Sequence, residues 1–246
     1  MTKQEEVVTV SNEEIIRNMF VTRSKNIKGH DPWRYGEELS EFTDKIEFDW
    51  IVNNFDIGEN DSIIDVGCGT GRHVLMLAEL TKAGRIVGCD FVSESIDFLN
   101  ERIGEMGLYH ASGVCCNATD FSKHVGVESC NIVVAIGVVQ YLTNEEHLAS
   151  FSLSCSDLLN PGGNLILKHP LSLTQSFILD YYRDEMETRY VSHYYNLPDI
   201  MKFFEENFEL MRIERTFTKF SVGEKIDEVE RDPRARQMWI CLEKKK

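Results

Sequence analysis

The chain has 246 residues, of which 42% are hydrophobic, 10% aromatic and 27% charged. This length and composition are typical of one sizeable α/β domain, with or without a small lid, and they exclude a disordered or fibrous protein. The formal net charge of −15 repels phosphate backbones and anionic lipid, so we expect neither nucleic acid nor a membrane surface as a partner.

The cysteines and the first residues indicate the compartment. Seven cysteines occur without a CxxC pair, a spacing typical of reduced thiols. The stretch MTKQEEVVTV lacks the basic and then apolar pattern of a signal peptide, and no apolar run approaches the roughly 20 residues of a membrane span. We therefore expect a cytoplasmic protein.

Residues 1–57 are predicted to form a helical cap or lid. Ser11 and Glu14 match a capping box, and polar residues with Gly and Pro at 22–38 predict a loop between two helices. The second helix is indicated by four apolar residues that recur at intervals of three and four: Leu39, Phe42, Ile46 and Trp50. The loop could close over a ligand or lie on the surface, and its polar and aromatic residues are His30, Trp33, Arg34 and Tyr35.

From residue 58 onward, short apolar runs alternate with amphipathic stretches, which is typical of a parallel sheet with crossover helices. Strands are predicted at 62–66, 85–91, 113–117, 130–136 and 164–168, and helices at 72–80, 93–106 and after a second capping box of Thr143 and Glu146. The remainder is predicted as helices at 171–189 and 198–207 and strands at 208–220 and 236–243. Residues 58–246 are thus expected to be one compact unit, with a lid insertion at about 171–197.

The most informative stretch is 63–72, IIDVGCGTGR. A strand ends at Asp65, three glycines follow at Gly67, Gly69 and Gly71, and a helix begins directly afterwards. Glycine allows a sharp turn and lets the backbone approach a ligand, while the helix N-terminus contributes oriented N–H groups. The dinucleotide fingerprint has its third glycine three residues after the second, whereas here it comes two after, so the spacing argues against NAD.

A carboxylate at the end of the next predicted strand supports a nucleoside ligand. Asp90 comes 23 residues after Gly67, where a carboxylate can accept hydrogen bonds from both ribose hydroxyls. The stretch from Asp65 to Gly71 resembles the first motif of class I S-adenosylmethionine-dependent methyltransferases, and Asp90 resembles their second. The resemblance covers roughly residues 60–170 and implies a Rossmann-like, doubly wound, seven-stranded, mostly parallel sheet with an antiparallel last strand.

The resemblance also implies a set of residues that bind S-adenosyl-L-methionine. Residues 116–120, CNATD, are similar to the adenine-recognition segment, with Asn117 in the place of the usual acidic residue and the backbone N–H of Ala118 after it. The backbone near Ile136 is expected to face the methionine moiety, and Phe91 either stacks on the adenine or fills the core. The implied cofactor-binding residues are Asp65, Gly67, Cys68, Gly69, Gly71, Asp90, Phe91, Asn117, Ala118 and Ile136.

The acceptor is less constrained by the sequence. His169, at the end of a predicted strand, is the first candidate for a general base, with a structural histidine as the alternative. Methyl transfer from a sulfonium needs no metal, and none is expected. The acidic composition favours the N or O atom of a small metabolite as the acceptor, and four tyrosines are expected around it: Tyr35, Tyr141, Tyr194 and Tyr195.

Three other functions remain open. The chain could methylate a protein or peptide, it could be a catalytically silent cofactor-binding subunit that serves a partner, or it could use the cofactor for another reaction. The oligomeric state is not indicated by the sequence.

Overall fold

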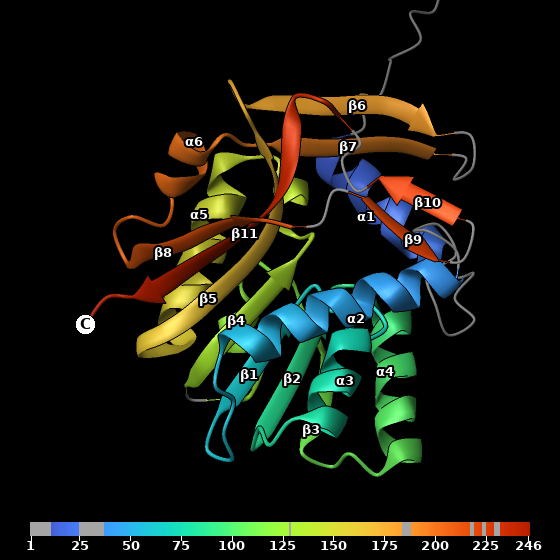
Figure 1. The fold of residues 1–246 in the computed structure, drawn as a ribbon, viewed down its shortest axis with the longest axis vertical. Helices are drawn as coiled ribbons and strands as arrows, with labels where there is room; N and C mark the ends of the chain where they lie inside the picture. Colours follow the sequence, from blue (N-terminus) through green and yellow to red (C-terminus); the bar gives the residue numbers. More distant parts are fainter. Residues whose placement is uncertain are drawn as a thin grey trace, which may run out of the picture.

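Seven strands form one sheet at the centre of the computed structural model, which describes residues 11–24, 37–127, 129–183, 188–216, 219–222, 225–228 and 232–246. The strand order is β3-β2-β1-β4-β5-β11-β8 (Figure 1). The strands are β1 (Ser62–Val66), β2 (Arg85–Asp90), β3 (Ala111–Cys115), β4 (Cys130–Ile136), β5 (Leu159–Ser172), β8 (Phe208–Arg215) and β11 (Ala235–Lys244). β11 is antiparallel to both of its neighbours, and the pairings among β1 to β5 are parallel. The predicted Rossmann-like sheet with an antiparallel last strand is confirmed.

The strand order reverses between β1 and β4, which places a ligand-binding crevice. The connection that leaves β1 runs to β2 on one side, and the connection that leaves its sheet neighbour β4 runs to β5 on the other side. In open α/β sheets, ligands bind outside the carboxyl ends of the strands at such a point. The residues that follow β1, β2 and β4 therefore share one edge.

Alternation along the strands builds a core on each face of the sheet. Ile64 and Val66 of β1 pack with α5 (Glu145–Leu158), whereas Ile63 packs with α3 (Arg72–Leu80) and α4 (Ser93–Met106). Each face is covered by helices, as the continuous apolar runs of β1 and β4 require. Both cores lie below the edge that carries the predicted site.

The two predicted N-terminal helices are confirmed as α1 (Asn12–Ser24) and α2 (Glu37–Asn54). The backbone N–H of Glu14 donates to the Ser11 side chain at 3.2 Å, as the capping box predicted. The indole of Trp50 stacks on Trp239 of β11 at 4.1 Å between ring centroids, which fixes α2 across the sheet. The loop residues His30, Trp33, Arg34 and Tyr35 lie outside the described residues.

The apolar residues that recur at helical spacing in α2 do not form its buried side, as far as their side chains are described. Phe42 is exposed and Ile46 and Trp50 are only half-buried. The buried side instead carries Thr43, Asp44, Glu47, Phe48 and Ile51. Acidic residues occupy this buried face because Asp44 and Glu47 form ion pairs with residues of the domain beneath α2.

The helix predicted at 171–189 is wrong, because this segment forms strands. β5 continues to Ser172, and β6 (Phe177–Arg183) then pairs with β7 (Thr188–Tyr194) as an antiparallel hairpin. Aromatic and β-branched residues favour strands, and cross-strand ring contacts stabilise them. Tyr181 lies opposite Tyr190, with 5.2 Å between the ring centroids. α1 packs beside β7 (Figure 1).

Smaller differences concern element ends. α5 is capped by Asn144 rather than Thr143, since the Asn144 side chain accepts from His147 N at 2.7 Å. The predicted helix at 198–207 reduces to α6 (Leu197–Met201), and the strand predicted at 208–220 ends at Arg215. A hairpin of β9 (Lys219–Val222) and β10 (Lys225–Glu228) follows. No helix in the described part of the chain is long and apolar enough to cross a membrane.

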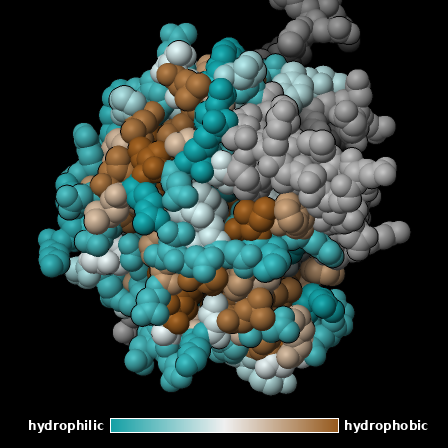
Figure 2. All heavy atoms as spheres, viewed as in Figure 1, coloured by the Kyte–Doolittle hydropathy of each residue, from teal (hydrophilic) through white to brown (hydrophobic). Residues whose placement is uncertain are grey.

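The surface is mixed rather than uniformly polar. On the face drawn in Figure 2, apolar side chains lie among hydrophilic ones. Large hydrophobic residues are exposed on several different elements, and they include Leu80, Tyr109, Leu153 and Tyr182. Single apolar residues of this kind are normal on a folded protein, so they do not by themselves indicate a partner.

Candidate active site

The glycine loop after β1 has two tightly packed glycines and one that faces open space. All three adopt positive φ, with values of 70° at Gly67, 55° at Gly69 and 77° at Gly71. A Cβ on Gly67 would lie 2.5 Å from Val138, and one on Gly71 would overlap the side chain of Leu99. A Cβ on Gly69 would meet nothing within 4 Å. The loop thus has the form of a cradle whose middle glycine faces a space that a ligand can occupy.

Asp90 at the end of β2 is hydrogen-bonded to this loop. Its Oδ2 accepts from Gly69 N at 3.0 Å, and its Oδ1 accepts from Val92 N at 2.9 Å. The hydrogen bond from Gly69 therefore joins the glycine loop to the second sequence motif at Asp90. An ionised carboxylate has about four lone-pair positions, so acceptor capacity for ribose hydroxyls remains.

The segment after β3 lies beside Asp90. Cys116 N donates to the Asp90 carbonyl at 3.0 Å, which places the exposed Asn117 and the half-buried Ala118 at the same edge. Phe91 is half-buried next to Asp90, and Ile136 is the last residue of β4. The structure thus brings the predicted cofactor-binding residues to one edge of the sheet.

Two side chains of the first motif are electrostatically unusual. Burial, followed by the Asp90 and Glu47 charges, raises the pKa of Asp65 from 3.8 to about 7, although His73 acts in the opposite direction. One carboxylate oxygen of Asp65 has no hydrogen-bond partner among the described residues. Burial also raises the pKa of Cys68 well above its usual range, so this thiol is neutral.

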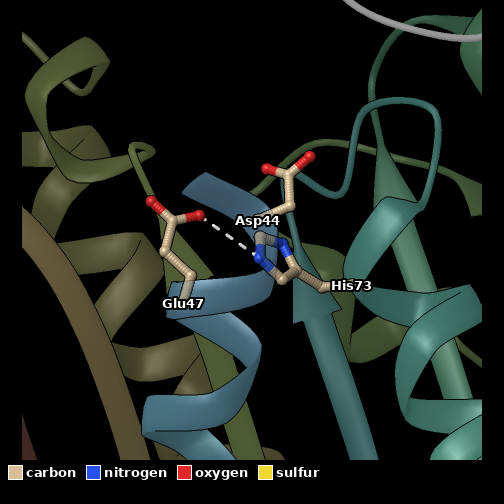
Figure 3. A group of neighbouring side chains, drawn as sticks. All are labelled: Asp44, Glu47 and His73. Atoms are coloured by element: carbon tan, nitrogen blue, oxygen red, sulfur yellow. Dashed lines mark ion pairs between the residues drawn. The ribbon is translucent and has the colours of Figure 1, made fainter. Parts of the chain in front are cut away.

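A buried charge network connects α2 to the domain. Glu47 is fully buried and forms an ion pair with Lys168 of β5 and another with His73 of α3, at 3.2 Å (Figure 3). Asp44, one turn earlier, pairs with Arg72 at 2.6 Å. Burial alone would lower the pKa of His73, but the hydrogen bond to Glu47 and the nearby carboxylates raise it.

This network was missed in the sequence. Its only signal was a pair of acidic residues, Asp44 and Glu47, within an otherwise apolar helix face. Ligand atoms of Asp44, Glu47 and His73 lie within 4.8 Å of one another, as in a metal site (Figure 3). Arg72 pairs with Asp44, and Lys168 pairs with Glu47. Because each carboxylate already has a cationic partner, the arrangement fits a balanced ion-pair network.

The predicted catalytic histidine is buried and neutral. His169 is inaccessible to solvent, and burial, helped by His193, lowers its pKa to about 3. Neither ring nitrogen has a hydrogen-bond partner among the described residues. The ring of Tyr195 lies 6.0 Å from His169 and 3.7 Å from His193 between centroids. In this arrangement His169 takes up a proton only far below neutral pH.

The aromatic ring of Phe20 on α1 reaches the cofactor-binding edge. The ring of Phe20 stands edge-on to Phe91 at 5.9 Å and to Tyr141 at 4.9 Å. Tyr141 belongs to the short helix η2 (Val139–Tyr141) after β4 and contacts Tyr190 of β7 at 6.2 Å. Of the four tyrosines expected near an acceptor, Tyr141 is in this row, Tyr194 and Tyr195 are buried nearby, and Tyr35 lies outside the described residues.

Comparison with known proteins identifies the domain. A family model described as "Methyltransferase domain" matches residues 63–163, which include the glycine loop, Asp90 and β4. Residues 63–163 thus form a methyltransferase domain. The site described above lies within the matched residues of this methyltransferase domain, apart from the contributions of α1, α2, the end of β5, β7 and Tyr195.

Two curated relatives of the methyltransferase domain are named as RNA methyltransferases. The small-subunit ribosomal RNA methyltransferase G of Staphylococcus haemolyticus is 29% identical over 142 residues, covering 54% of this chain and 56% of that protein. A tRNA N(3)-methylcytidine methyltransferase of Schizosaccharomyces pombe is 27% identical over 130 residues, covering 48% and 50%. The chain thus spans about half the length of the curated relatives it matches.

Solved structures share the fold over nearly the whole chain. A geranyl diphosphate C-methyltransferase of Streptomyces coelicolor, solved with Mg²⁺, geranyl diphosphate and S-adenosyl-L-homocysteine, superposes with a TM-score of 0.66. The superposition covers 96% of this chain and 98% of that one at 13% identity. The fold therefore extends beyond the matched methyltransferase domain.

The expectation that nucleic acid is excluded as a partner is wrong. It relied on the net charge of −15, whereas the curated relatives are ribosomal RNA and tRNA methyltransferases. Net charge averages over the whole surface, so it does not determine the potential at one binding face. The net charge of this chain therefore does not exclude a nucleic-acid acceptor.

Proposed function

We propose that the chain binds S-adenosyl-L-methionine and transfers its methyl group to a nitrogen or oxygen atom of a small molecule. The proposal rests on one observation. The Asp90 carboxylate accepts a hydrogen bond from the Gly69 amide, and a side chain at Gly69 would point into open space. A ribose held by Asp90 would lie against the glycine loop, with the helix N-terminus of α3 behind it.

The cofactor-binding residues proposed from the sequence fit this arrangement. Asp65 and the glycine loop would receive the methionine end, Phe91 with Asn117 and the Ala118 amide would receive the adenine, and Ile136 would border the methyl group. One carboxylate oxygen of Asp65, which has no hydrogen-bond partner in the described part of the chain, suits the ammonium group of the cofactor. Cys68 contributes through its place in the loop, because its thiol is neutral.

The proposed domain organisation makes residues 1–57 a cap and residues 171–197 a lid. Contacts of α1 with β7, and of Phe20 with Tyr141, support enclosure of the acceptor from both sides. Enclosure excludes water from the transfer and favours a small acceptor. We place the protein in the cytoplasm, which its seven free cysteines support.

His169 is proposed to position the acceptor rather than to remove its proton. A neutral imidazole offers one donor and one acceptor, and its low pKa makes it a weak base at neutral pH. An amine acceptor would need no base if the pocket keeps it unprotonated.

RNA is the second candidate acceptor, because both curated relatives named above methylate RNA. A methylation assay with radiolabelled S-adenosylmethionine separates the two candidates. Label transferred to pooled amines, phenols and carboxylates favours the first, and label in total RNA favours the second. If the cofactor binds but no label is transferred to small molecules, RNA or protein, the chain is a silent cofactor-binding subunit.

Cofactor binding is tested first by calorimetry with S-adenosylmethionine and S-adenosylhomocysteine. Asp90→Ala should weaken binding by roughly 2 to 4 kcal/mol, because two charge-assisted hydrogen bonds are lost. Asp97→Ala, which removes an exposed carboxylate on α4, is the matched control and should bind as the wild type does. Absence of binding in folded wild-type protein would refute the proposed function.

A further inference from the structure

The contact between α1, η2 and β7 forms a small cluster of apolar and aromatic side chains, which we call the ring cluster. Met19 and Tyr190 are buried in it, and Phe20, Tyr141 and Leu179 pack around them. It lies next to the cofactor-binding edge, since Phe20 also contacts Phe91, the residue after Asp90. The ring cluster is separate from both main cores.

A buried hydroxyl without a partner among the described residues faces the ring cluster. Side chains two residues apart on a strand point to the same face, so Ser192 shares a face of β7 with Tyr190. Its cross-strand neighbour is Leu179, another member of the ring cluster. Ser192 is 0% exposed, and no hydrogen bond in the described part of the chain reaches its hydroxyl. Native proteins hydrogen-bond nearly all such groups, so this hydroxyl is a candidate to bind a ligand.

A second group of this kind lies on η2. The side-chain oxygen of Gln140 is buried and has no hydrogen-bond partner among the described residues. Gln140 precedes Tyr141, the η2 member of the ring cluster. Ser192 offers a donor and acceptors, and the Gln140 oxygen offers an acceptor.

The chemistry of the ring cluster is uncharged. Its members are apolar or aromatic, and the Ser192 and Gln140 side chains are neutral. A charged group placed there would lose its hydration without gaining a counterion from these residues. A flat ring with hydrogen-bonding edges would instead gain face and edge contacts with Tyr141 and Tyr190.

We propose that the ring cluster is the acceptor-binding site and that it takes a flat, uncharged ring, hydrogen-bonded by Ser192 and Gln140. In this structure the Phe20 ring lies edge-on to both Phe91 and Tyr141, so an acceptor ring that binds there would have to displace the Phe20 side chain. The inference rests on the proposed methyl transfer. The ring belongs either to a free aromatic compound or to a nucleobase of RNA.

Ligand-observed NMR on the complex with S-adenosylhomocysteine tests the site with defined probes. Phenol and uracil carry a flat, uncharged ring, cyclohexanol carries a hydroxyl without a flat ring, and benzoate carries a charged ring. An oligouridylate of eight nucleotides tests whether the site binds a uracil ring that is part of an RNA chain. We expect phenol and uracil, or the oligouridylate alone, to bind, and cyclohexanol and benzoate to bind at least several-fold more weakly.

Two serine variants provide a matched comparison. Ser192→Ala should weaken binding of the flat ring by about 3- to 10-fold, as expected for one neutral hydrogen bond. Ser152→Ala also removes a buried hydroxyl that has no partner in the described part of the chain, but Ser152 lies on α5, which packs on one of the main cores. This control should leave ring binding unchanged, and both variants should bind S-adenosylhomocysteine as the wild type does.

The outcomes separate the site from the proposed function. Binding of a free ring that depends on Ser192 supports a small-molecule acceptor, and binding of the oligouridylate alone with the same dependence supports a nucleobase. Equal effects of both serine variants, equal binding of benzoate, or no ring binding by a sample that binds S-adenosylhomocysteine would overturn the site and leave the cofactor proposal intact. Failure to bind S-adenosylhomocysteine refutes the proposed function, whatever the probes show.

Discussion

Replacement of Asp65 by asparagine is predicted to stabilise the ligand-free protein and to weaken cofactor binding. Folding raises the pKa of this carboxyl from 3.8 to about 7, chiefly through burial. The native state therefore binds the proton more tightly than the unfolded chain. It follows that the free energy of unfolding falls as the pH rises from about 4 to about 7 and changes little above that.

The magnitude follows from the pKa difference. A rise of the Asp65 pKa from 3.8 to about 7 corresponds to roughly 4 kcal/mol at 25 °C. This value is the largest loss in the free energy of unfolding that ionised Asp65 can cause at pH 8. The side-chain amide of asparagine does not ionise, so Asp65→Asn removes the penalty at every pH. The variant should be more stable than the wild type by up to roughly 4 kcal/mol at pH 8 and nearly equal to it at pH 4.

Urea unfolding at pH 4, 6 and 8 measures this difference, with Asp157→Asn as the control because Asp157 is exposed on α5. S-adenosylhomocysteine should stabilise the wild type more than Asp65→Asn, since its ammonium group loses a carboxylate partner in the variant. Parallel pH dependence of the wild type and Asp65→Asn would refute the reasoning, because it would show that Asp65 ionises equally in the folded and unfolded states.

Two further perturbations test the loop and the charge network. Gly71→Ala should destabilise the fold by roughly 2 to 4 kcal/mol in urea unfolding, because the new Cβ needs positive φ and overlaps the buried Leu99, whereas Gly69→Ala should cost about 1 kcal/mol and mainly impair cofactor binding. Equal destabilisation by both would contradict the packing argument. Lys168→Met should destabilise by roughly 3 to 5 kcal/mol because it leaves Glu47 buried without its ammonium partner, and addition of Glu47→Gln should recover most of the loss in a double-mutant cycle. A double variant no more stable than Lys168→Met would argue against the ion pair as the cause.

The central sheet could be predicted from the sequence because its signals are local. Buried parallel strands form apolar runs such as 130–136, and the glycine spacing after β1 marks the turn into α3. The hydrogen bond from the Gly69 amide to Asp90 agrees with the predicted strand ends, since residues at the carboxyl ends of neighbouring strands share an edge. Local pattern and tertiary structure agree in this part of the chain.

The segments around the proposed acceptor site could not be predicted, because their structure depends on contacts with residues far away in the sequence. The hairpin of β6 and β7 has aromatic residues that also suit an amphipathic helix, and only pairing such as Tyr181 with Tyr190 decides between the two. The buried face of α2 contradicts a hydrophobicity pattern because Glu47 pairs with Lys168, which is 121 residues away. Whether His169 titrates near neutral pH depends on its burial, which the sequence does not encode locally.

The position of β11 has a consequence for how the sheet is assembled. β11 follows β8 in the chain, yet it lies between β8 and β5 and is the sheet neighbour through which β8 is attached. During synthesis β8 emerges from the ribosome first, and its native sheet neighbour does not exist until residues 235–244 have been made and have paired with β5. Half-made chains therefore carry β8 as an unpaired segment, and a lesion in β11 would release two strands from the sheet rather than one.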